Sequence, residues 1–152
     1  MATSGPKSTS STAFITSILG LYKIDANTVG GTPANGYIRY DNAAQISAAN
    51  LHVALETTNG IDVEHFLSLL SVGNFITIQD KNDYLNFQTW EINSLPVLSG
   101  SFYIFPVTLT NSGGTGTTGF ANNHEVFLAS FGAAQAAVSN VDLVQFTQYG
   151  GL

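Results

Sequence analysis

The 152-residue sequence contains no cysteine. This absence excludes disulfide bridges, thiolate nucleophiles and cysteine-ligated metal sites. A chain of this length has the size of one ordinary domain and can bury a single sizeable core. We therefore expect the fold to depend on packing of apolar side chains.

Charged residues are scarce, at 9% of the chain against a usual share of about 25%. Ten acidic residues outnumber four basic ones, and Lys7, Lys23, Arg39 and Lys81 are scattered singly. Nucleic-acid binding needs a basic stripe, so we expect no nucleic-acid partner. A nearly neutral surface gives little repulsion between copies and favours a homo-oligomer, for which a trimer is our hypothesis.

Long apolar runs are also missing. No stretch approaches the ~20 apolar residues of a membrane-spanning helix. The beginning, MATSGPKSTSSTAF, lacks the charged and apolar regions of a secretory signal peptide. The sequence predicts a soluble protein without a membrane partner.

The composition divides the chain into three parts. Residues 1–12 are rich in Ser and Thr, and residues 27–36 carry three Gly and one Pro. Residues 13–24 are more apolar, with a spacing that fits both a helix and a strand. We expect an N-terminal arm and linker at 1–35, a folded domain at 36–131 and a C-terminal arm at 132–152.

The central part alternates short β-rich runs with turn signals, which predicts a mainly β fold, a small antiparallel β-barrel or sandwich. In the run 84–92, Leu85 and Phe87 are expected on the packed face, with Gln88 and Trp90 opposite. The expected strands lie at 36–42, 50–58, 74–80, 84–92, 101–110 and 124–131.

One short helix is expected at 63–71, with Asp62 as its N-cap and Gly73 just past its end. The segment Asn111–Gly119 has four Gly in nine residues and is interpreted as a flexible loop. It lacks the Gly-Lys-Ser/Thr ending of a phosphate-binding loop.

The sequence offers no recognisable catalytic or metal-binding motif. His52, His65 and His124 stand apart from any metal-binding spacing, and we interpret them as surface residues. No Gly-x-Ser-x-Gly motif occurs, and the pair Asp80 and Asp83 is typical of a polar turn. We expect no metal, no cofactor and no enzymatic activity.

Aromatic residues leave two interpretations open. They pack most often in cores and cross-strand pairs, but they can also form a platform that stacks on sugars or bases. The set consists of Tyr37, Tyr40, Tyr84, Trp90, Phe102, Tyr103 and Phe105.

Three segments taken together carry a resemblance: GYIRYDNA from Gly36, NGIDVEHFLSLLSVGNFITIQD from Asn59, and FANNHEVFLASF from Phe120. In this order they resemble a β-rich domain that recurs in virion proteins of tailed phages. The resemblance covers about two-thirds of the chain and neither arm. The matching residues are Gly36, Tyr37, Asn42, Gly60, Ile61, Asp62, Val63, Gly73, Ile76, Ile78, Gln79, Asp80, Phe120, Asn122, Asn123, Val126 and Leu128.

The resemblance implies a structural protein of the phage particle, made in the host cytoplasm and located on the virion surface. One hypothesis is a capsid decoration, or cement, protein that binds the major capsid protein and other virion proteins. The alternative is a tail-fibre or tail-tip module that binds a host surface glycan through Trp90 and exposed tyrosines. The chain has no collagen-like repeat and no coiled-coil heptads, which argues against a fibre.

If the arms contact the partner, their apolar residues are the candidates for binding it. In this interpretation the loop at 111–119 faces outward. The candidate residues are Phe14, Ile15, Ile18, Leu21, Tyr22, Val144, Phe146 and Tyr149.

Overall fold

The computed structural model describes residues 14–133, of which Thr16–Phe131 form a compact unit. Every helix within the described range is too short to cross a membrane. The elements are β1 (Phe14–Ile24), β2 (Tyr37–Tyr40), the 3-10 helix η2 (Gln45–Ser47), β3 (Asn50–Ala54), α1 (Glu64–Ser68), β4 (Phe75–Asp80), β5 (Phe87–Ile92), β6 (Val97–Ser99), β7 (Phe102–Gly113), α2 (Thr115–Thr118) and β8 (Glu125–Ala133).

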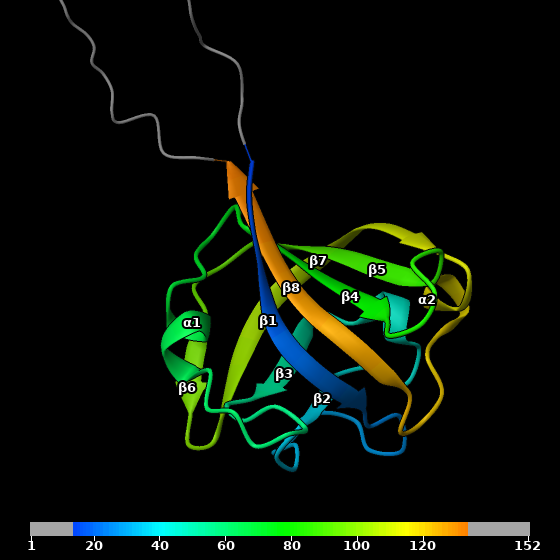
Figure 1. The fold of residues 1–152 in the computed structure, drawn as a ribbon, viewed down its shortest axis with the longest axis horizontal. Helices are drawn as coiled ribbons and strands as arrows, with labels where there is room; N and C mark the ends of the chain where they lie inside the picture. The colour runs from blue at the N-terminus through cyan, green and yellow to red at the C-terminus, as the bar shows by residue number, and fades with distance from the viewer. Residues whose placement is uncertain (1–13, 134–152) are drawn as a thin grey trace, which may run out of the picture. The chain divides into compact units, whose positions relative to one another are not determined.

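The strands form one sheet in the order β3-β2-β1-β8-β4-β5-β7-β6 (Figure 1). An additional β3–β7 pairing closes seven of them into a barrel and leaves β6 outside, paired with β7. The β1–β2 pair is parallel, while β4 runs antiparallel to both β5 and β8. The predicted mainly β fold, and within it the barrel, is confirmed.

Strand β1 corrects the expected start of the folded domain. Lys23 pairs with Tyr37 and Ile24 with Ile38, so β1 lies in the barrel wall. Leu19, Tyr22 and Ile24 are buried in the core. The barrel therefore begins before Gly36, inside the region expected to be an arm and linker, because β1 is needed to join β2 to β8.

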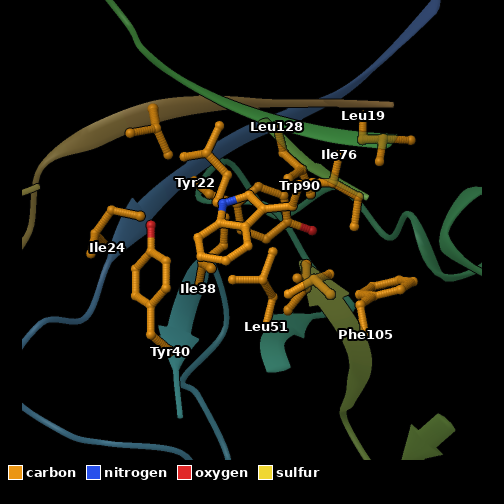
Figure 2. Packing of buried hydrophobic residues seen from close by; sticks show 14 of the residues in the cluster. Leu19, Tyr22, Ile24, Ile38, Tyr40, Leu51, Ile76, Trp90, Phe105 and Leu128 are labelled. Atoms are coloured by element: carbon orange, nitrogen blue, oxygen red, sulfur yellow. The ribbon is translucent and has the colours of Figure 1, made fainter. Parts of the chain in front are cut away.

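The core fills the barrel interior. Figure 2 shows the Trp90 ring among apolar side chains from several strands, and this ring is fully buried. Tyr40 lies near it, with the two ring centroids 6.2 Å apart. The labelled neighbours include Tyr22, Leu51, Ile76 and Leu128, which are also buried.

The two faces of β5 are the reverse of those expected. Gln88, Trp90 and Ile92 point inward and are buried, while Phe87 is half-buried on the other face. Alternation was predicted correctly, but both faces carry large apolar residues. Sequence spacing therefore did not show which face belongs inside.

The expected helix is present but shorter. It covers Glu64–Ser68 with Val63 at the N-cap position, and the Asp62 carboxylate accepts a hydrogen bond from the Glu64 amide at 2.9 Å. Gly73 has φ +92°. Its amide donates to the Ile92 carbonyl, so this glycine begins the β4–β5 hairpin instead of ending the helix.

The glycine-rich segment is also not the loop that was expected. Strand β7 continues to Gly113, and α2 follows at once. A Cβ on Gly116 would collide with the Phe87 carbonyl oxygen, and one on Gly113 would lie 2.8 Å from the Leu85 carbonyl oxygen. These glycines allow two backbones to approach each other closely.

Candidate functional site

The predicted partner-binding residues of β1 are separated by the structure. Ile18 is 73% exposed and remains available, and Leu21 is half-buried. Tyr22 is fully buried, and its hydroxyl donates to the Ala54 carbonyl at 2.8 Å. Tyr22 is therefore a core residue and cannot contact a partner.

The remaining predicted contacts lie where no side chain is described. Phe14 and Ile15 belong to β1, but their side chains are not described. Val144, Phe146 and Tyr149 lie outside the described residues. Their role stays a prediction.

Trp90 cannot serve as a stacking platform, because its ring is enclosed by the core (Figure 2). Its indole N–H donates to Gln88 Oε1 at 3.3 Å. Of the tyrosines expected to join it, Tyr40 is also buried, and Tyr84 is exposed in the β4–β5 turn. The structure thus removes the residue on which the glycan hypothesis was centred.

The three histidines are far from equivalent. His52, expected at the surface, is buried against Phe102, and its Nδ1 lies 2.7 Å from the Gly31 carbonyl oxygen. His65 is exposed on α1. His124 Nε2 lies 2.8 Å from Asp80 Oδ2. Among residues 14–133 no three His, Asp or Glu side chains gather to hold a metal ion.

Asp80 ties the end of β4 to the turn that follows. Its carboxylate accepts hydrogen bonds from the amides of Asn82 at 2.7 Å and Asp83 at 3.2 Å. The Asn82 amide bond, and then the His124 contact, lower the pKa of Asp80 despite its burial. The arrangement is that of a turn held by its own carboxylate, with His124 fixing β8 beside it.

An acidic hollow of about 280 Å³ opens where the β3 end, the α1 start and the β6–β7 turn meet. Burial raises the pKa of the nearby Tyr22 hydroxyl, and the negative charge of Asp62 raises it further. The lining residues are Asn35, Leu55, Glu56, Asp62, Glu64 and Ser101.

Two segments, 62–74 and 93–101, are connected to each other at both ends. At one end Asp62, Glu64 and Ser101 line the same hollow. At the other end the Ile92 amide and carbonyl bond to Asn74 and Gly73.

Between these two ends the segments expose large apolar side chains, each 46–74% accessible. We call this set the apolar surface. Sequence analysis did not single these side chains out, because their exposure is decided by the fold and not by the local pattern. The apolar surface consists of Phe66, Leu69, Val72, Leu95, Val97 and Leu98.

The residues that carry the phage resemblance lie mainly in the strands and turns of the barrel. The Tyr37 hydroxyl donates to Asn123 Oδ1 at 2.8 Å, and Asn122 Oδ1 accepts from the Ala26 amide at 2.9 Å. A Cβ on Gly36 would lie 2.8 Å from the Thr58 Cα. These residues hold strands and turns together.

No family model, no curated protein and no solved structure matches this chain.

Proposed function

We propose that this chain is a non-enzymatic structural protein of a phage particle, and specifically a capsid decoration protein that binds across neighbouring capsid subunits. The observation that carries the proposal is that a closed barrel exposes the large side chains of the apolar surface. Exposed apolar patches of this kind mark protein-binding surfaces. The resemblance to a domain of tailed-phage virion proteins supports the choice of partner.

The arrangement of the first and last strands supports binding across more than one subunit. Strands β1 and β8 are neighbours, and Ile24 near the end of β1 bonds to His124 before the start of β8. The two strands therefore run in opposite directions, and the β1 start and β8 end lie at the same end of the sheet. Terminal segments that join there can add contacts to those of the barrel, and linked contacts multiply affinity.

A capsid-binding experiment tests the proposal. Purified protein is mixed with expanded phage heads that lack it, the heads are pelleted, and bound copies are counted on a quantitative gel. Saturable binding at many copies per head is the expected result. Binding to tails or host cells, with none to heads, would instead assign the protein to an adhesion module.

A further inference from the structure

We propose that Asn59 is a site of spontaneous deamidation, in which the backbone amide of Gly60 attacks the Asn59 side chain and the Thr57 hydroxyl assists the reaction. The reaction takes place within one turn of the barrel and consumes only water, so it does not depend on the proposed function.

The sequence contains two Asn-Gly pairs, Asn35-Gly36 and Asn59-Gly60. Asparagine is among the chemically labile residues of proteins. A glycine that follows it has no Cβ to hinder the approach of its amide nitrogen to the asparagine side chain. The sequence alone therefore gives two candidate reaction sites and does not distinguish them.

The structure holds the first of these glycines inside a hydrogen-bonded region. Gly36 is buried, its amide donates to the Glu56 carbonyl at 2.8 Å, and its carbonyl accepts from the Lys23 amide at 2.8 Å. The bond to Glu56 must open before the Gly36 amide can reach the Asn35 side chain. Such openings are rare where the backbone is buried and paired on both sides.

The second pair lies in an exposed turn. Asn59 and Gly60 are both exposed, and no atom of the described residues lies within 4 Å of the place that a Cβ on Gly60 would occupy. The Gly60 amide donates to the Thr57 carbonyl at 3.0 Å, and this turn bond must loosen for the attack. An exposed turn opens at a lower free energy than a buried pairing, so Asn59 is the more reactive of the two asparagines.

Thr57 places a hydrogen-bond donor on the oxygen where negative charge develops. Thr57 is buried, and its hydroxyl donates to Asn59 Oδ1 at 2.6 Å. The same hydroxyl oxygen accepts from the Ile61 amide at 3.1 Å, which holds it in place. When the Gly60 nitrogen attacks Cγ, Oδ1 becomes an oxyanion that this fixed donor stabilises. The Asn35 side chain instead donates from its amide nitrogen to Glu56 Oε1 at 3.2 Å.

The reaction consumes one water molecule and releases ammonia. The Gly60 nitrogen loses its proton and bonds to Asn59 Cγ, the Cγ–Nδ2 bond breaks, and Nδ2 takes up a proton and leaves as ammonia. Water then opens the resulting succinimide ring at either carbonyl and gives aspartate or isoaspartate. The new carboxylate lies in the turn across which Glu56 and Asp62 pair, so it adds a third negative charge there.

The first test follows both asparagines in the wild-type protein. The folded protein is incubated in mildly alkaline buffer, and peptide mapping with mass spectrometry locates the products. We expect Asn59 to react at least about tenfold faster than Asn35 while the protein is folded. In urea, where both local structures are lost, the two rates should agree within about threefold. Equal rates in the folded protein, or no product at Asn59, would overturn the proposal.

The second test measures what the Thr57 hydroxyl contributes. Thr57→Val removes the hydroxyl and keeps the side-chain shape, whereas Thr57→Ser keeps the donor. The valine variant should react about tenfold more slowly at Asn59, and the serine variant within about threefold of wild type. Urea unfolding checks that each variant is folded under the reaction conditions. An unchanged rate in folded Thr57→Val would overturn the role of the hydroxyl, and the wild-type comparison identifies the site without any substitution.

Discussion

Gln88 connects three parts of the barrel from a fully buried position. Its Oε1 accepts hydrogen bonds from the Tyr40 hydroxyl at 2.6 Å and the Trp90 indole at 3.3 Å. Its Nε2 donates to the Gly116 carbonyl at 3.0 Å and to Gln45 Oε1 at 3.3 Å. A buried amide with all its groups bonded can fix which strands and turns meet there.

Replacing Gln88 with Leu should lower the free energy of unfolding by about 2–4 kcal/mol, because the Tyr40 and Trp90 donors lose their acceptor inside the core. Urea unfolding at neutral pH measures this change. Gln79→Leu is the control, since Gln79 on β4 is only half-buried on the outer face. Equal losses for the two variants would show that the buried network contributes nothing specific.

Asp80 should make the free energy of unfolding depend on pH in the acidic range. Its pKa is lowered in the folded state, so its contribution is fully present above the unfolded value of about 3.9. That contribution is lost as the pH falls from this value through the lower folded pKa. Asp80→Asn should therefore lower the free energy of unfolding at pH 7. The difference in free energy of unfolding between wild type and variant should become smaller at about pH 2–3.

The measurement is thermal or urea unfolding of both proteins across this pH range. If the two proteins differ by the same free energy of unfolding at pH 7 and at about pH 2–3, the charge of Asp80 does not stabilise the turn.

In α2, helix propensity and packing predict opposite effects of the substitution Gly116→Ala on stability. Gly116 lies inside this helix, and helix propensity alone favours Ala over Gly by about 1 kcal/mol. In the structure a Cβ at this position meets the Phe87 backbone, which cannot move aside easily. The element depends on the absence of a side chain.

Gly116→Ala should therefore destabilise the protein, by about 1–3 kcal/mol, which is typical of an overpacked site. Thr118→Ala, at an exposed position of the same helix, is the control and should change stability by less than about 0.5 kcal/mol. Denaturant unfolding compares the two. Stabilisation by Gly116→Ala would contradict the close packing of α2 on β5.

For the whole molecule, closure of the barrel depends on β1. Removing residues 1–35 would delete the strand between β2 and β8, together with the core residues Tyr22 and Ile24. We expect this truncation to abolish the cooperative unfolding transition and the near-ultraviolet signal of the buried Trp90.

Removing residues 1–13 instead should leave the fold intact and weaken head binding. The reason is that β1 stays complete, while the head contacts that the proposed function assigns to the terminal segment are removed. Thermal unfolding checks the fold, and the pelleting experiment counts bound copies. Unchanged binding after this deletion would restrict the capsid contacts to the rest of the chain.

The sequence by itself determined the fold class. Alternating apolar residues and turn signals predicted the strands of β2, β3, β4, β5, β7 and β8, and the short helix, because these patterns depend on neighbouring residues. The scarcity of charge likewise predicted a protein with a nearly neutral surface.

Only the tertiary structure decided which side chains are inside and which surface is available. Period-two alternation shows that β5 has two different faces. Leu85 and Phe87 make one face apolar, Trp90 and Ile92 make the other apolar, and only closure of the barrel determines that Trp90 and Ile92 point inward. Tyr22 becomes a core residue for the same reason. The exposure of the apolar surface was likewise decided by the fold, because a local pattern does not show which apolar residues face solvent.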